Sequence, residues 1–203
     1  ISPYGAQNGL SATLARLTAP GVPDTYQGSE GWNQSLVDPD NRRPVDYPGL
    51  SARLEALETA HADDPLGAAV ERLGRYQDGD VKLLVSWAAL QARRRHPALF
   101  QQGGYLPLKT GRFLIAFARQ HASGTAVIAA PRLSLSLTRE KQPWALGEAW
   151  GKRELTLPES GKYRNVLTGE VFSVRGHKLA LSRLFAHFPL ALLLREESVK
   201  KAL

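Results

Sequence analysis

The chain has 203 residues, of which 43% are hydrophobic and 22% charged, and its formal net charge is +7. These values are those of an ordinary globular protein, and they exclude disordered, collagen-like and disulfide-rich small proteins. The absence of cysteine also excludes a thiolate nucleophile and any cysteine-ligated metal centre.

Charge is divided unevenly along the chain. Residues 1–80 hold 6 Lys and Arg against 12 Asp and Glu, whereas residues 81–203 hold 20 against 7. The one basic cluster, Arg93–Arg95, falls at the end of an expected helix, where cations complement the helix dipole. The longest apolar run, Pro189–Leu194, is far shorter than the roughly 20 residues of a membrane-spanning helix. We therefore expect neither a nucleic-acid nor a membrane partner.

The N-terminus has no signal peptide, and the chain contains no methionine. These features predict a cytoplasmic protein and an internal or C-terminal piece of a longer one.

Four helices are expected in the first hundred residues. Leucines at helical spacing predict a helix over residues 6–18 and a second around residues 50–57. Asp64 and the following proline begin a third helix, and a fourth is capped by Asp80 and ends before Pro97.

A short strand and a long loop are expected between the first two helices. Val22–Gln27 predicts the strand, and Gly28–Pro48 is a loop dense in Asp, Asn, Pro and Arg. Loops of about twenty residues are uncommon inside compact domains and are usually functional. The search for a site therefore begins here.

From residue 101 onward, glycine-punctuated apolar runs predict strands. The expected strands are residues 105–108, 113–118, 125–130, 133–137, 154–157, 163–167, 171–174, 178–181 and 185–194. Runs with turn signals at intervals of roughly eight to twelve residues favour an antiparallel sandwich or barrel. We place a domain boundary near Gly103-Gly104, which gives domains of residues 1–100 and 101–203.

The long loop and the turn before it carry the candidate site. Carboxylates, an amide and planar guanidinium groups supply donors and acceptors that suit sugar hydroxyls, and Tyr26 and Trp32 could stack on a sugar ring. The candidate substrate-binding residues are Tyr26, Glu30, Asp40, Asn41, Arg42 and Arg43.

Other interpretations of this loop compete with sugar binding. Arg42 and Arg43 could instead pair with Asp38, Asp40 or Asp46 and simply hold the loop rigid. A calcium loop of the EF-hand type is disfavoured because Arg43 stands where that pattern needs glycine. The five histidines show no metal-ligand spacing, so no metal site is expected.

The residues from Pro20 to Glu30, Pro-Gly-Val-Pro-Asp-Thr-Tyr-Gln-Gly-Ser-Glu, resemble the eighth barrel strand of glycoside hydrolase family 13, the α-amylase superfamily. The pattern of that strand is G-x-P-x-x-Y-x-G-x-E. The run Ser35–Tyr47 narrows the resemblance to one trehalose-forming branch, and Arg93–Phe100 is similar to the element that leads into the superfamily's C-terminal β-domain. The resemblance implies an α+β chain: the last strand and helices of a (β/α)8 TIM barrel, followed by an antiparallel C-terminal β-sandwich domain.

The resemblance also implies a reaction. Enzymes of this branch convert the reducing-end α-1,4 linkage of a maltooligosaccharide to an α,α-1,1 (trehalose) linkage by intramolecular transglucosylation, without a cofactor. The superfamily's nucleophile, acid–base and third carboxylate lie on earlier barrel strands, so we assign no catalytic residue in this chain. The implied partners are the maltooligosaccharide and the rest of the barrel, and the chain alone is expected to be inactive.

Two other functions stay open. The chain could belong to another hydrolase or transferase of the α-amylase superfamily, or it could be a carbohydrate-binding or interaction module with exposed aromatics such as Trp144 and Trp150. Tryptophans of this kind are more often packed in a core or at a sheet edge, which is the favoured interpretation of these two. Because a lone barrel strand cannot pair its backbone groups, residues 1–48 are also expected to be poorly anchored unless the rest of the barrel or a second copy of the chain pairs with them.

Overall fold

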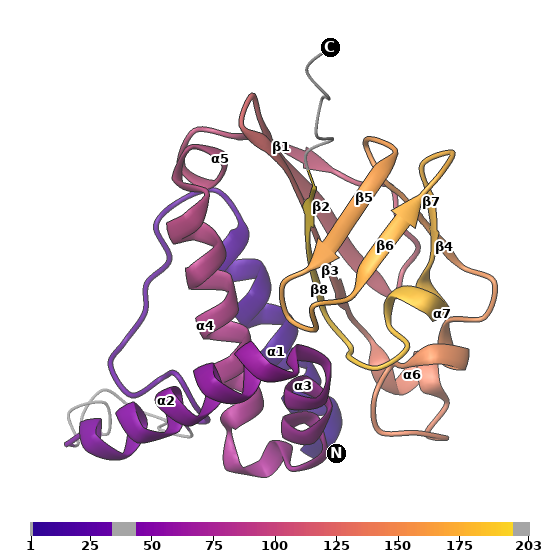
Figure 1. Ribbon diagram of the computed structural model, residues 1–203. Helices are drawn as coiled ribbons and strands as arrows, with labels where there is room; N and C mark the ends of the chain where they lie inside the picture. Colours follow the sequence, from indigo (N-terminus) through magenta and orange to yellow (C-terminus); the bar gives the residue numbers. More distant parts are fainter. Residues whose placement is uncertain (1, 34–43, 197–203) are drawn as a thin grey trace.

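The structure is a computed structural model that describes residues 2–33 and 44–196. The helices before residue 102 lie on one side of the molecule and an antiparallel sheet on the other, with two short helices beside the sheet (Figure 1). The elements in chain order are α1 (Ser2–Thr18), α2 (Tyr47–Asp63), α3 (Pro65–Gly74), η2 (Tyr76–Asp78), α4 (Asp80–Arg95), α5 (Pro97–Gln101), β1 (Gly104–Pro107), β2 (Leu114–His121), β3 (Gly124–Pro131), α6 (Ser134–Thr138), η3 (Gly147–Trp150), β4 (Glu154–Thr156), β5 (Gly161–Asn165), β6 (Val171–Val174), β7 (Lys178–Ala180), α7 (Leu181–Leu184) and β8 (Ala191–Arg195).

The main sheet has six strands in the order β1-β2-β3-β8-β5-β6, and β4 pairs with β7 in a separate two-stranded ladder. Side chains alternate between the two faces of the sheet. On β3, Ala126 and Ile128 belong to one core cluster, whereas Val127 and Ala129 belong to the other. A central strand that is buried on both faces has apolar residues at consecutive positions, and this explains why β3 is apolar along nearly its whole length.

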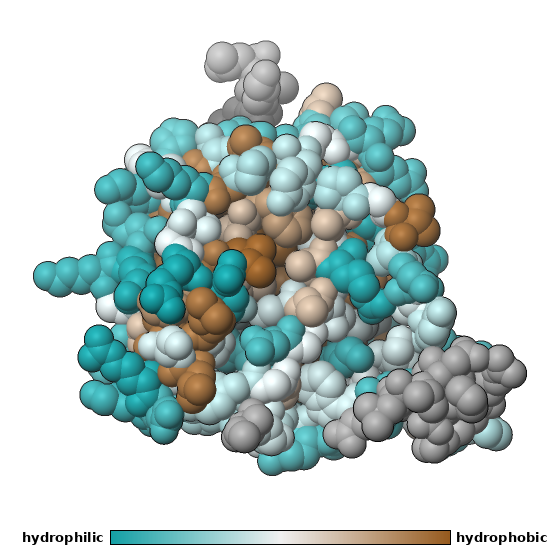
Figure 2. Space-filling view, turned by 180° about the vertical axis from the view of Figure 1, so that it is seen from behind, coloured by the Kyte–Doolittle hydropathy of each residue, from teal (hydrophilic) through white to brown (hydrophobic). Residues whose placement is uncertain are grey.

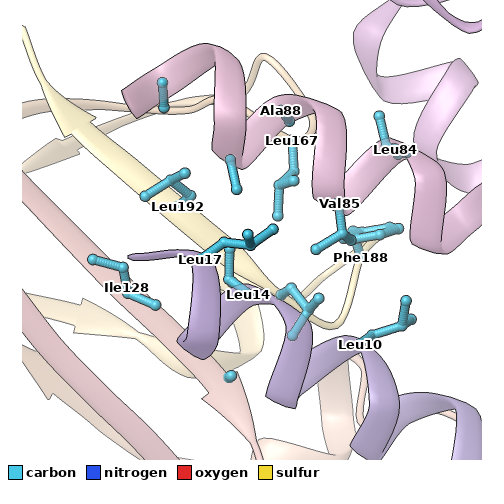
Figure 3. Close-up of a cluster of buried hydrophobic side chains, with 14 of the residues drawn as sticks. Leu10, Leu14, Leu17, Leu84, Val85, Ala88, Ile128, Leu167, Phe188 and Leu192 are labelled. Carbon is cyan, nitrogen blue, oxygen red and sulfur yellow. The ribbon is translucent and has the colours of Figure 1, made fainter. Parts of the chain in front are cut away.

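The first core cluster joins helices to the sheet. Leu10, Leu14 and Leu17 lie on one face of α1 at helical spacing and are almost completely buried. They pack against α4 and against Ile128 and Leu192 of the sheet (Figure 3). The expectation that residues 1–48 are poorly anchored is therefore wrong for α1, because its apolar face is buried without any barrel partner.

The second core cluster lies on the other face of the sheet, under β4, β7 and α7. Trp150 is 0% exposed, donates from Nε1 to the carbonyl of Ala145 at 2.8 Å, and lies 5.0 Å from the ring of Phe185. Trp144 is 8% exposed. Both tryptophans are core residues, so the favoured interpretation is confirmed and the alternative of exposed sugar-binding aromatics is wrong.

Most predicted helices form where the local signals place them. Asp64 caps α3 by accepting a hydrogen bond from the amide of Gly67 at 3.0 Å, and α4 ends before Pro97. The fourth helix begins differently from the prediction. Asp80 is the first residue of α4 and therefore not its cap; the N-cap is Gly79. The carboxylate of Asp78 accepts a hydrogen bond from the amide of Asp80 at 2.8 Å.

The predicted barrel strand at Val22–Gln27 does not form. These residues have no regular structure, and Val22 is 98% exposed. A barrel strand needs a neighbour on each edge to satisfy its backbone groups, and every strand pair among the described residues is antiparallel and lies beyond residue 103. No part of a barrel sheet is present in the described residues, and helices rather than a second large sheet cover one face of the main sheet.

Two other expected strands are also wrong in part. Residues 134–137 belong to α6, because both edges of β3 are already paired with β2 and β8 and leave no place for another strand. Residues 185–194 contain only the strand β8, which begins at Ala191. The remaining predicted strands match β1 to β7 to within a few residues.

Candidate functional site

Of the six candidate residues, Tyr26 and Glu30 are described, whereas Asp40, Asn41, Arg42 and Arg43 lie outside the described residues. Tyr26 begins a turn: its carbonyl accepts from the amide of Ser29 at 3.2 Å and from the Ser29 hydroxyl at 2.6 Å. Gly28 has φ +78°, a left-handed conformation that favours glycine at this position. The turn leaves the Tyr26 side chain 58% exposed and available for contact.

The two ends of the long loop lie together. A Cβ on Gly28 would be 3.1 Å from the side chain of Val45, and the Tyr47 hydroxyl is 2.6 Å from Oε1 of Gln27. Asp46 then caps α2 by accepting from the amide of Gly49 at 3.0 Å. The described residues on the two sides of the loop, Gln27–Gly28 and Val45–Tyr47, therefore contact each other at the start of α2.

Glu30 lies in the same turn, next to the start of α4. Its Oε2 atom is buried and has no hydrogen-bond partner among the described residues. The ammonium of Lys82 donates to the carbonyl of Gly31 at 2.9 Å. Burial lowers the pKa of Lys82, the nearby charge of Arg16 lowers it further, and the negative charge of Glu30 opposes that change. Glu30 thus supplies an acceptor in a partly desolvated setting beside a cation.

Trp32 is held between three elements. Its Nε1 donates to the carbonyl of Tyr76 at 2.6 Å, and the Lys82 ammonium lies 5.7 Å from its ring centroid. A Cβ on Gly9 would be only 3.3 Å from the ring, so glycine in α1 allows Trp32 to lie against the helix. These contacts fix the indole ring, which sequence reasoning had considered only for stacking on a sugar.

Trp32 forms one wall of a cavity of about 800 Å³. Small residues of α1, including Gly5, Gly9 and Thr13, form another wall, and Tyr76 and Lys82 line it as well. Aromatic rings with a few polar groups are typical of small-molecule sites. Sequence reasoning missed this cavity, although the four-residue spacing of small side chains on α1 was a signal for it.

Among residues 2–33 and 44–196, no group of three His, Asp or Glu side chains could hold a metal ion. In the same part of the chain, no helix is long and apolar enough to cross a membrane.

No protein-family model matches the chain. Its fold is shared with an α-amylase from Anoxybacillus, over 95% of this chain and 32% of that one, with 20% sequence identity and a TM-score of 0.51. At this level of identity the likeness concerns the fold alone, which matches that of part of this α-amylase.

Higher identity points to one enzyme within that class. Over 98% of its length, the chain is 35% identical to two curated proteins of Mycobacterium tuberculosis that are provisionally assigned as maltooligosyl trehalose synthases. Two structures of maltooligosyltrehalose synthase from Arthrobacter ramosus, one a mutant and one not, are 36% and 34% identical, with TM-scores of 0.74 and 0.67 over 95% of this chain. The chain is therefore a relative of part of maltooligosyltrehalose synthase, and the predicted resemblance is confirmed.

The similarity covers much less of the relatives than of this chain. The chain spans 22% of the length of the curated relatives and 22% of the Arthrobacter ramosus chains.

Proposed function

We propose that this chain is the C-terminal portion of a cytoplasmic maltooligosyltrehalose synthase. The complete enzyme converts the reducing-end α-1,4 linkage of a maltooligosaccharide to an α,α-1,1 linkage by intramolecular transglucosylation. The observation that carries this proposal is the 35% identity over 98% of the chain. The nucleophile and acid–base belong to the part of the enzyme that precedes residue 1, and the reaction needs no cofactor.

In this proposal, residues 1–100 complete the catalytic barrel and residues 101–203 form its C-terminal β-domain. Tyr26, Glu30 and the loop residues Asp40, Asn41, Arg42 and Arg43 line or shape the sugar-binding end. The ring of Tyr26, which is 58% exposed, supports a role in sugar contact, and the buried Oε2 of Glu30, which has no partner among the described residues, supports a role in shaping the site. The fixed base of the loop supports it too, since positioning a substrate requires rigid anchors.

The test is incubation with maltopentaose of this chain alone, and of this chain mixed with a polypeptide that corresponds to the remaining part of the enzyme. The assay follows loss of reducing ends and release of free glucose or shorter sugars. We expect loss of reducing ends without release, in the mixture only. Activity of the chain alone would contradict the proposal, and release of sugars without loss of reducing ends would favour a hydrolase of the same superfamily.

A matched pair of variants tests the site in the active mixture. We expect Glu30→Gln to lower turnover about tenfold or more, the size expected when a charge-assisted hydrogen bond to the substrate is lost. Glu55→Gln, on the exposed side of α2, removes the same charge and should leave turnover unchanged. Equal effects of both variants would show that net charge, and not the position of Glu30, is responsible.

A further inference from the structure

A second cavity lies far along the chain from the candidate sugar site, around α6 and η3. Its volume is about 450 Å³, within the range of about 300–1,000 Å³ that is typical of small-molecule pockets. The residues Thr138, Arg139 and Lys141 line one side, and Glu148 and Arg153 line another. None of these residues belongs to the site proposed above.

The charge of this cavity is positive. Three cationic side chains line it against the single carboxylate of Glu148, and Arg139 and Lys141 form neither an ion pair nor a side-chain hydrogen bond with any described residue. Unpaired cations that gather in a cavity repel each other, and an anion bound between them would relieve that repulsion.

Thr138 provides an independent indication of a ligand. The residue is 4% exposed, and its hydroxyl is buried without a hydrogen-bond partner among the described residues. A buried hydroxyl without a partner is costly, and in native proteins such groups usually have a water, ion or ligand to bond. The next two residues, Arg139 and Glu140, have φ values of +51° and +62°, a conformation that non-glycine residues seldom adopt.

The aromatic ring at this cavity is already engaged. The guanidinium groups of Arg112 and Arg153 lie 5.0 and 5.4 Å from the ring centroid of Phe113. Arg153 also donates from Nη1 to the carbonyl of Trp150 at 3.0 Å, so its position is fixed while its other N–H groups remain available. The guanidinium of Arg153 is therefore held in place to bind an oxyanion. The ring of Phe113 is covered by two guanidinium groups and is not free to stack on a sugar.

We propose that this cavity binds a phosphate group, either as free phosphate or as the ester of a small molecule. Arg139, Lys141 and Arg153 neutralise its charge, and the Thr138 hydroxyl donates a hydrogen bond to one of its oxygens. Three cations match a phosphate dianion better than a singly charged carboxylate, and Arg–phosphate pairs are frequently bidentate.

The test is titration of the whole chain, followed by amide chemical shifts at constant ionic strength. The probes are inorganic phosphate, glucose 6-phosphate and glucose. We expect saturable shifts at Thr138–Lys141 with both phosphates and none with glucose. Tighter binding of glucose 6-phosphate would identify an esterified ligand, whereas equal or tighter binding of inorganic phosphate would identify the free ion.

Variants separate a built site from general attraction to a basic protein. The double variant Arg139→Ala and Lys141→Ala, and separately Thr138→Val, should each weaken binding about tenfold or more. Arg94→Ala, an exposed position on α4, should not change it. Melting temperatures would verify that each variant is folded.

Three outcomes would overturn the proposal. They are the absence of saturable shifts with either phosphate, equal weakening by the Arg94→Ala control, and the same shifts with glucose alone.

Discussion

Arg119 and Thr18 are 101 positions apart in the sequence, yet Nη1 of Arg119 donates to the carbonyl of Thr18 at 3.2 Å. The arginine is 1% exposed and also donates to the carbonyls of Phe100, Gly103 and Gly104. Carbonyls at the last turn of a helix have no partner within the helix, so this one side chain in β2 satisfies the ends of α1 and α5 together. It joins the helical layer to the sheet.

Replacement of Arg119 is expected to be strongly destabilising. Arg119→Met leaves four backbone carbonyls without their donor, and an unsatisfied buried group costs about 1–3 kcal/mol. We expect the free energy of unfolding to fall by about 3 kcal/mol or more in urea titrations at neutral pH. Arg119→Lys should lose nearly as much, because one ammonium cannot reach all four carbonyls. A loss no larger than that of Arg94→Met, an exposed control, would contradict this role.

The two aspartate caps are expected to contribute equally. Asp46 and Asp64 each precede Xaa-Xaa-Gly and accept a hydrogen bond from the glycine amide at 3.0 Å. Asp46→Ala and Asp64→Ala should each lower the free energy of unfolding by about 1 kcal/mol, as loss of an N-cap usually does. Asp63→Ala, one position before the second cap, should cause no such loss. If the three variants were equally destabilising, the cap geometry would not be the cause.

We expect His61 to make the stability of the chain depend on pH. Its ring lies edge-on to Trp87 at 4.9 Å, and its Nε2 is buried without a partner among the described residues. Burial lowers the pKa of His61 below its usual 6.5, the charges of Arg72 and Arg95 lower it further, and the backbone of Leu167 and Val166 opposes the change.

Because the folded pKa of His61 is lower than the unfolded one, the unfolded chain binds more protons as pH falls through 6.5. Stability should therefore decline on acidification below that pH, and the contribution of His61 should be absent above it. Melting temperatures measured from pH 7.5 to 5 should decline less steeply for His61→Gln than for the unmodified chain.

Limited proteolysis should cut the chain between α1 and α2. Residues 20–29 have no helix or strand and are mostly exposed, and Figure 1 shows that the chain that follows α1 runs along the outside of the molecule. We expect the first cuts by proteinase K to fall in residues 20–29, with α1 remaining bound through its buried leucines. Mass spectrometry of the native digest would detect α1 with the larger product. Earlier cuts within α1 would contradict the packing of its leucines.

The exposed apolar residues of this chain do not indicate an interface. The face in Figure 2 is mostly hydrophilic, with apolar side chains in patches. The large apolar residues that remain exposed, such as Val22, Leu90 and Tyr105, come from separate elements and follow no common pattern. Folded proteins expose much apolar surface, so such residues do not by themselves predict an interface.

Sequence reasoning succeeded where a signal is local. The cap at Asp64 and the proline after His96 bound their helices as expected, because each acts within one turn of the backbone. The segment Pro20–Glu30 led to the α-amylase superfamily even though its expected strand does not form in this chain. Strand formation depends on a pairing partner, and residues 133–137 were assigned wrongly for the same reason: alternation predicts a strand only where a sheet edge is free.

The sequence by itself determined where most helices lie, most of the strands and the likeness to maltooligosyltrehalose synthase, since these depend on neighbouring residues or on a motif. Only the tertiary structure decided that α1 packs on the sheet, that Arg119 joins the two layers, and that Arg139, Lys141 and Thr138 line one cavity. These relationships join residues through space. Such contacts form only when the folded chain brings distant residues together and their buried polar groups find hydrogen-bond partners. The order of residues along the chain does not show which of them will meet.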